Sequence, residues 1–257
     1  MALKYSTGLR NFLVGEGSLR KAFEDAVLNI YSGAALANGD DAPTGVLLAK
    51  ITKASGALAA GARSTPKRYK VVIGSHAEGH TFPFALTVDG VGPTTFTYTN
   101  TPDAGDAEAV AKAIARMPND LPQLMAIAEG ANGALYVQSR IDGLDFTLAD
   151  AGGGSGTITS VTQVEAASSV NSLRFGNPAA GALAKNSDVW SGVGRANGTA
   201  GYFRLVTLGD GGLLSTTDIR IQGTISTSGG DLNMSSLNIA LCATQTIDAF
   251  PLTFPAS

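Results

Sequence analysis

The chain has 257 residues, of which 15% are charged and 32 are glycine, and its formal net charge is −3. This length is enough for one large domain or two of ordinary size, and the glycine-rich, charge-poor composition argues against an all-α fold. The slight negative charge argues against nucleic acid as the main partner, because neutralising phosphates requires clustered Lys and Arg. The one short basic cluster, Lys67, Arg68 and Lys70, does not change that balance.

The cysteine content and the lengths of the apolar runs indicate in which compartment the protein is expected. Cys242 is the only cysteine, so neither an intramolecular disulfide nor a multi-thiolate metal site can form within one chain. The segment from Met1 to Ser6 lacks the apolar core of a signal peptide, and no later run approaches the roughly 18 residues of a membrane span. We expect no membrane partner and a chain kept in the cytosol until it is assembled.

Two short helices are expected at the start of the chain. Thr7 is a candidate N-cap before Leu9, and Ser18 is a candidate N-cap for a helix that reaches Val27. Residues 28–31 and 46–51 then read as strands separated by a turn-rich stretch.

The middle of the chain has mixed α and β character. Asp106 is followed by apolar residues at helical spacing that end before Pro118, which predicts one amphipathic helix. Strands are predicted around it, separated by Asp89-Gly90, Asn132-Gly133 and similar turns, at residues 69–73, 84–88, 94–98, 124–128, 134–139, 146–148 and 157–164. We summarise this block, residues 69–165, as a ββαβββ module, and the glycine run 152–156 suggests mobility between it and the rest.

Short strands resume after the middle block. They are predicted at residues 189–190, 202–207, 219–225, 237–241 and 247–254, a spacing typical of a β-sandwich. The expected fold is therefore mainly β: an antiparallel β-sandwich-like domain formed by residues 1–68 and 166–257, with residues 1–27 as a helical N-terminal arm and 69–165 as an inserted α+β module. Insertion into a loop costs little entropy. Three small units in tandem are the alternative.

The two histidines are the first candidates for chemistry. His76 and His80 stand four residues apart, the spacing that places two imidazoles on one helix face for zinc. Glycines and a proline surround the pair, and Glu78 does not follow the first histidine directly as a metalloprotease would require. We prefer a solvated or interface loop over a metal site.

Two glycine-rich motifs also resemble functional ones. Ser155 lies in a run similar to a nucleophile elbow, but the glycine two positions after the serine is missing, so a flexible turn is the better interpretation. Gly192-Val193-Gly194 does not continue with the spacing of a dinucleotide fingerprint. A hairpin turn at Asn197-Gly198 explains these glycines better.

The remaining candidates are assigned structural roles. Acidic residues could bind a hard cation but lack the spacing of a calcium loop, so we assign turn and helix-cap roles to Asp40, Asp41, Asp103, Asp106 and Glu108. Cys242 follows an apolar run and is expected to be a buried hydrophobe. The aromatic residues Trp190, Tyr202, Phe203 and Phe250 are assigned mostly to the core, with an exposed carbohydrate-binding platform left open. We predict no catalytic, cofactor-binding or metal-binding residue, and no cofactor.

Two separate parts of the sequence carry a recognisable pattern of strands and turns. The early part is Leu28 to Gly33 followed by Asp41 to Leu48. The late part is a tryptophan strand, an aromatic-arginine strand and a hairpin, here Val189 to Gly192, Gly198 to Arg204, Ile219 to Thr224 and Asp231 to Met234. These parts resemble small structural proteins of tailed phages, and the resemblance covers roughly residues 1–60 and 185–257.

The middle block is similar to a separate phage-associated module. The shared pattern is an Asp-Gly turn between two strands, at Asp89-Gly90, and a Thr-Tyr-Thr strand, at residues 97–99, before a helix opened by Asp106. These patterns contain no catalytic residues, so the resemblance implies a structural role.

The resemblance implies a non-enzymatic virion protein, most simply a capsid decoration or minor capsid protein that stabilises the head by protein–protein contacts. Its expected partners are the major capsid protein and copies of itself, in a trimer or another symmetric homo-oligomer. Residues 1–27 are expected to form an arm onto a neighbour, so that deleting 1–17 would abolish incorporation while leaving the β domain folded. A tail tube, baseplate or fibre-like adhesin that binds host glycans is the alternative, and a cell-wall hydrolase ranks third because no acid–base pair stands out.

Overall fold

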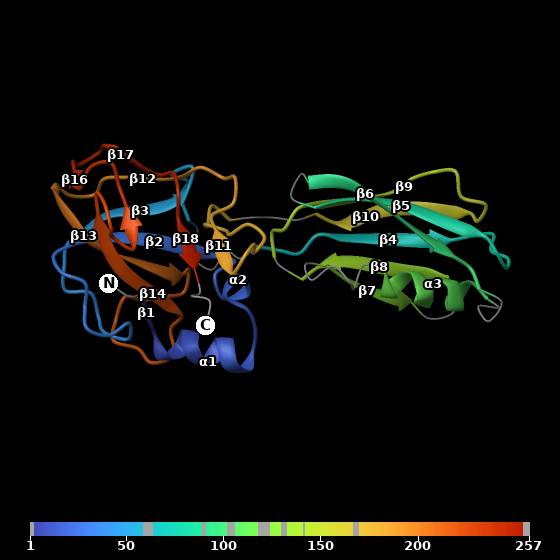
Figure 1. Cartoon of the computed structure of the whole chain (residues 1–257), viewed down its shortest axis with the longest axis horizontal. Coiled ribbons are helices and arrows are strands. Elements are labelled where there is room, and N and C mark those ends of the chain that lie inside the picture. Colours follow the sequence, from blue (N-terminus) through green and yellow to red (C-terminus); the bar gives the residue numbers. More distant parts are fainter. Residues whose placement is uncertain are drawn as a thin grey trace. The chain divides into compact units, whose positions relative to one another are not determined.

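The computed structural model describes residues 3–58, 64–88, 91–101, 106–117, 124–129, 133–140, 142–166 and 170–253. The chain divides into two compact units: unit 1 comprises Met1–Arg63 and Val170–Ser257, and unit 2 comprises Ser64–Ser169 (Figure 1). Strands make up 46% and helices 10% of the structure, which confirms the mainly β fold class.

Unit 1 is built on one nine-stranded sheet. The strands run in the order β1-β14-β13-β2-β3-β12-β17, with β15 beside β14 and β16 beside β13. Their bounds are Lys4–Tyr5 (β1), Ala26–Ser32 (β2), Leu47–Lys53 (β3), Trp190–Val193 (β12), Gly198–Thr207 (β13), Arg220–Ser226 (β14), Leu232–Asn233 (β15), Asn238–Ile239 (β16) and Thr244–Ile247 (β17). A separate two-stranded sheet joins β11 (Ala182–Ala184) to β18 (Pro251–Thr253).

Strands from both ends of the chain share this sheet. β2 pairs with β13, placing Ile30 opposite Phe203, and β3 pairs with β12, placing Lys53 opposite Trp190. Three small units in tandem would have kept the early and late strands in separate sheets. The observed boundaries of the middle unit lie at 63/64 and 169/170, compared with the expected 68/69 and 165/166.

The first residues of the chain are part of the core of unit 1. Helix α1 (Thr7–Gly15) and helix α2 (Leu19–Ala22) follow each other, and Leu9 and Phe23 are completely buried in the apolar cluster of the sheet. A Cβ on Gly8 would approach the Thr217 carbonyl oxygen to 2.2 Å, so this turn of helix packs directly against the backbone. The described part of the expected arm onto a neighbour, residues 3–27, therefore packs against its own chain.

The helix bounds also differ from the predicted ones. The side chain that caps α1 belongs to Ser6, which accepts a hydrogen bond from Leu9 N, and not to Thr7, the first helical residue. Ser18 caps α2 as predicted, but the helix ends at Ala22 and Val27 lies in β2. The apolar residues after Ala22 are buried as part of the sheet, which overrides their helical spacing.

An aromatic cluster fills the core of unit 1. The Trp190 ring lies 5.4 Å from Phe175 and 5.6 Å from Phe250, and Phe203 lies 5.2 Å from Phe250 in an edge-to-face arrangement. Trp190, Tyr202, Phe203 and Phe250 are all almost completely buried. This confirms their assignment to the core and leaves no exposed platform made of these rings.

In its described residues, unit 2 contains two smaller antiparallel sheets and one helix. One sheet has the order β10-β4-β8-β7 and the other the order β6-β5-β9. The elements are Arg68–Ile73 (β4), Thr81–Val88 (β5), Val91–Thr99 (β6), Ala107–Arg116 (α3), Leu124–Glu129 (β7), Ala134–Ser139 (β8), Phe146–Asp150 (β9) and Ile158–Glu165 (β10). Three strands precede the helix and four follow it, so the ββαβββ summary undercounts the strands. It is one strand short on each side of the helix, although the predicted runs, which include 69–73 for β4, number three before the helix and four after it.

Three details of the late and glycine-rich segments are also corrected. The predicted strand 247–254 is two short strands, β17 and β18, because Phe250 between them turns into the aromatic core. Asn197-Gly198 does not turn a hairpin between neighbours, since β12 pairs with β3 and β17 while β13 pairs elsewhere. The glycine run 152–156 joins β9 to β10 inside unit 2, so it is not a hinge between the units.

Candidate interaction site at an arginine-clamped loop

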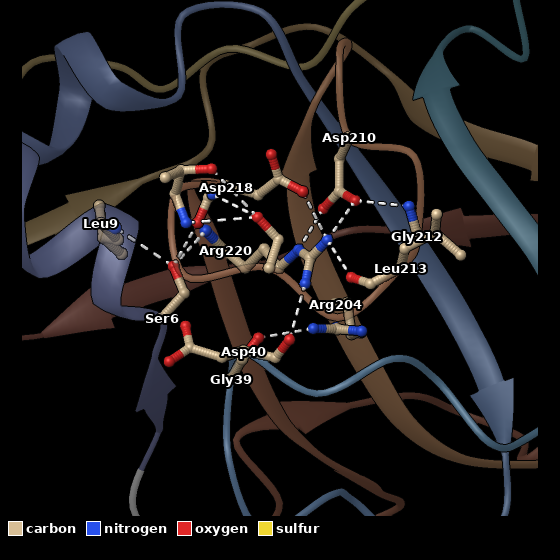
Figure 2. Close-up of polar contacts among 12 residues, drawn as sticks. Ser6, Leu9, Gly39, Asp40, Arg204, Asp210, Gly212, Leu213, Asp218 and Arg220 are labelled. Atoms are coloured by element: carbon tan, nitrogen blue, oxygen red, sulfur yellow. Dashed lines mark hydrogen bonds and ion pairs between the residues drawn. The ribbon is translucent and has the colours of Figure 1, made fainter.

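A buried arginine organises one end of unit 1. Arg220, the first residue of β14, is completely buried, and its guanidinium pairs with both carboxylate oxygens of Asp210, with Nε 2.6 Å and Nη2 2.7 Å from them (Figure 2). Nη2 also lies 2.7 Å from a carboxylate oxygen of Asp218. Such a two-pronged arginine–carboxylate pair fixes the geometry of both groups.

The same guanidinium holds two backbone carbonyls. It donates to the Leu213 oxygen at 2.7 Å and to the Asp40 oxygen at 3.1 Å. Burial alone would lower the pKa of Arg220, but the hydrogen bonds and charge of Asp210, followed by the charges of Asp218 and Asp40, raise it above the ordinary value. Arg220 is therefore a permanent buried cation that connects β14, the loop 208–219 and the segment around Asp40.

Asp40 connects the cluster to helix α1. Its carboxylate accepts hydrogen bonds from the backbone N–H and the hydroxyl of Thr7, both at 2.7 Å. Burial by itself would raise the pKa of Asp40, but these hydrogen bonds, with the positive charges of Arg10 and Arg220, outweigh it and hold the pKa below 3.8. The ionised carboxylate thus ties the start of α1 to the arginine cluster.

Ser6 makes the second connection to the helix. Its hydroxyl donates to the backbone carbonyl oxygen of Asp218 at 2.7 Å and accepts from the backbone N–H groups of Leu9 and Arg220 (Figure 2). One side chain therefore caps α1 and joins it to the start of β14.

A second buried arginine lies beside the first. Arg204 on β13 is 2% exposed and donates to the Gly39 oxygen at 2.6 Å. Burial, followed by the neighbouring charge of Arg220, lowers the pKa of Arg204, whereas Asp210 acts in the opposite direction. Asp210 is thus held by Arg220, and Asp40 by Thr7, while the Asp218 side chain is 33% exposed.

The Arg220 cluster fixes the loop 208–219, which exposes two leucines. Asp210 accepts a hydrogen bond from Gly212 N at 2.7 Å, and Ser215 N donates to the Asp40 oxygen at 3.0 Å, so the loop is held on both sides of its tip. Leu213 and Leu214, at that tip, are 73% and 71% exposed. The loop therefore presents an apolar pair to solvent on a rigid polar support, which makes it a candidate contact surface for another protein.

Features of this site are visible in the sequence, but they did not identify it as a candidate site. Asp210-Gly211-Gly212 marks a turn, and two leucines follow it directly. Arg220 stands inside an apolar strand, where a charged residue needs a partner. The carboxylates that pair with it could not be identified without the fold.

The basic cluster is neutralised within unit 2. Lys67 pairs with Asp145 at 2.7 Å, Arg68 with Glu165 at 2.6 Å and Lys70 with Glu129 at 2.8 Å.

The histidine and serine candidates lie on the loops around β5. His76 and His80 are on the segment between β4 and β5, outside any helix, and His76 Nδ1 lies 3.1 Å from the Gly74 oxygen. Ser155 accepts a hydrogen bond from Thr81 N at 3.1 Å. Among the described residues, no three His, Cys, Asp or Glu side chains gather closely enough to hold a metal ion.

The acidic candidates make different contacts in the structure. Asp40 belongs to the arginine cluster, Asp41 accepts a hydrogen bond from Asn38 N at 3.2 Å, and Asp106 caps α3. Glu108 pairs with Lys112 one helical turn later. Asp103 lies outside the described residues. Asp41 and Asp106 thus have the turn and helix-cap roles assigned to them, whereas Asp40 and Glu108 make contacts that were not predicted.

Two predictions about the segment after β12 are wrong or incomplete. Cys242 is exposed, on a turn with φ of 63°, because its N–H donates to the Gly194 oxygen and the residue leaves the sheet. Gly192 and Gly194 are explained by close approach, since a Cβ on either would lie 2.1 Å from a backbone oxygen of Lys50 or Ala240.

A scan against protein-family models finds no matching family, and a search of curated proteins finds no significant match. None of the helices in the described part of the chain is long and apolar enough to cross a membrane.

Proposed function

We propose that the chain is a non-enzymatic structural protein of a tailed-phage virion, a decoration or minor capsid protein that stabilises the head by protein–protein contacts. The observation that carries this proposal is the exposed Leu213-Leu214 pair, held in place by the buried Arg220 cluster. The carboxylates of Asp210 and Asp40 are held within the cluster, so we take the loop as apolar contact area. The sequence resemblance supplies the virion context.

Copy number tests the location. In purified particles of the encoding phage, quantitative mass spectrometry against the major capsid protein is expected to give on the order of hundreds of copies, as a shell with high symmetry requires. A few tens of copies would place the protein in the tail or at a vertex instead. Absence from the particle would overturn the virion role.

A variant pair tests the loop itself. Replacing both Leu213 and Leu214 by Ser is expected to lower incorporation into particles, because the apolar contact is lost while the backbone oxygen that Arg220 holds remains. The matched control replaces Val14 and Val46, which are 91% and 58% exposed, by Ser. Equal incorporation of the two double variants would remove the loop from the proposal.

A further inference from the structure

Strand β6 forms an open edge of the smaller sheet in unit 2. It pairs with β5 on one side, and the sheet order β6-β5-β9 ends with it (Figure 1). The Pro83 oxygen on β5 accepts from Ala151 N, so Pro83 faces β9 and forms a non-hydrogen-bonded pair with its register partner, Thr97. The backbone N–H and C=O of Thr97 therefore point away from β5, and by alternation those of Thr95 and Thr99 do too.

This edge is exposed but firmly supported. The side chains of Thr95, Thr97 and Thr99 are exposed, and within the described ranges no residue accepts or donates a hydrogen bond on their outer side. On the opposite face, the Phe96 ring stacks on Phe84 at 5.4 Å. Tyr98 likewise stacks on Phe82 at 6.3 Å. The strand is thus a fixed template, with its backbone groups available for pairing.

The other outer strands of unit 2 carry charge. β7, β9 and β10 each end in an acidic residue, Glu129, Asp150 and Glu165 respectively. Charged residues on edge strands discourage pairing with another chain. The nine residues of β6, Val91–Thr99, contain no charged side chain. Glu129 and Glu165 are paired with Lys70 and Arg68, so the difference is one of sequence: β6 alone among the four has no charged side chain.

We propose that β6 pairs with β6 of a second copy of this chain, antiparallel, across a two-fold axis at Thr97. This register uses all three outward residues, because Thr97 then lies opposite itself and Thr95 opposite Thr99. Each facing pair exchanges two N–H···O bonds, and threonine pairs facing each other across strands are favourable. An uncharged sequence that is self-complementary about its centre fits an identical strand, as a two-fold interface requires. The proposal rests on β6 and does not depend on the virion role.

The charge of unit 2 predicts how this pairing responds to salt. Residues 64–169 contain eleven acidic and six basic residues, a formal charge of −5. Two such units repel each other while the edges themselves are neutral, so added salt should strengthen the association by screening the repulsion.

Sedimentation of the full chain tests the pairing. We expect a concentration-dependent monomer–dimer equilibrium that Thr97→Lys weakens at least about tenfold, because two lysines would face each other on the axis. Thr162→Lys, on an exposed threonine of β10, adds the same charge and should leave the equilibrium unchanged. A chain that stays monomeric at every concentration, or a dimer that Thr97→Lys does not weaken, overturns the proposal.

Cross-linking tests the register. In facing hydrogen-bonded pairs the Cα atoms lie about 5.5 Å apart, within the range of a disulfide. Thr97→Cys in a Cys242→Ser background should therefore oxidise to a covalent dimer, whereas Thr162→Cys in the same background should not. Equal cross-linking of both variants would exclude the two-fold pairing. The absence of cross-linking at position 97 would also exclude it, and is the result expected if a strand of another protein occupies this edge.

Discussion

At the scale of single residues, Arg220 carries the largest energetic consequence. Replacing it by Met would leave Asp210 buried without its partner and the Leu213 oxygen without a donor. Breaking a buried ion pair from one side costs about 3–5 kcal/mol, so we expect unit 1 of Arg220→Met to lose about that much stability. Denaturant unfolding can follow this by fluorescence, because Trp190 is the only tryptophan and is buried in unit 1. Arg195→Met, at an exposed arginine, should change stability by less than about 0.5 kcal/mol.

Asp40 predicts how unit 1 responds to acid. Its pKa is depressed in the folded state, so its stabilising effect is complete above the unfolded value of 3.8 and is lost as the pH falls through the lower folded value. The denaturant midpoint of the native protein should therefore fall steeply in this acid range. Asp40→Asn should be less stable near neutral pH and lose less in acid, with Asp188, whose pKa is also lowered, contributing equally to both proteins. Parallel acid curves for the two proteins would show that Asp40 contributes nothing.

Residue patterns in the sequence predicted the aromatic core of unit 1 better than the Arg220 cluster. Trp190, Phe203 and Phe250 could be assigned to the core because burial of aromatic side chains depends mainly on their own chemistry. The bonds of Arg220 join residues from distant parts of the chain, such as Asp40, and no local pattern encodes such a contact. Cys242 was misassigned for the same reason, because a turn fixed by Gly194 takes it out of the sheet.

At the scale of elements, helix α1 is an integral part of unit 1. Leu9 is completely buried, and Ser6 and Thr7 bind the arginine cluster. Leu9→Ala is expected to cost about 2–5 kcal/mol, while Val14→Ala, on the exposed side of the same helix, should cost less than about 0.5 kcal/mol. Thermal melting followed by circular dichroism measures both changes.

A larger change follows from the same contacts. Deleting residues 1–17 should prevent unit 1 from folding cooperatively, since it removes the buried Leu9, the Ser6 cap and β1 together. A truncated protein that melted like the full chain would restore the idea of a detachable arm.

Element types were easier to predict than element ends and partners. The strand runs at 69–73 and 134–139 and the helix after Asp106 follow simple periodicities, and the structure contains them as β4, β8 and α3. The end of α2 and the break between β17 and β18 depend on what each segment packs against, which periodicity does not contain.

At the scale of the whole molecule, unit 2 is a continuous segment whose first and last strands are paired with each other. Arg68 and Glu165 are register partners on the neighbouring strands β4 and β10, and Thr65 donates to the Ala166 oxygen. In unit 1, Lys53 N donates to the Asn171 oxygen at 3.0 Å. The two chain segments are thus held together on each side of the boundary.

Because the two ends of unit 2 are paired with each other, we predict that the units can be separated. Replacing residues 64–169 by a short Gly/Ser linker should leave unit 1 folded, with native Trp190 fluorescence and a cooperative melt, because a short loop is enough to close the gap. Residues 64–169 expressed alone should also fold, since their apolar core contains no residue of unit 1. Loss of cooperative unfolding in the linker variant would show that unit 1 depends on unit 2.

The pairing of Ile30 with Phe203 also sets an order of folding events. The main sheet of unit 1 cannot close until the C-terminal strands have left the ribosome, whereas unit 2 is a continuous segment that is synthesised earlier and can fold first. Once β4 and β10 have paired, the chain between Ile30 and Phe203 is effectively much shorter, which lowers the entropy cost of closing it by up to about 1 kcal/mol. Early folding of the inserted unit would thus speed the search of the outer segments for each other.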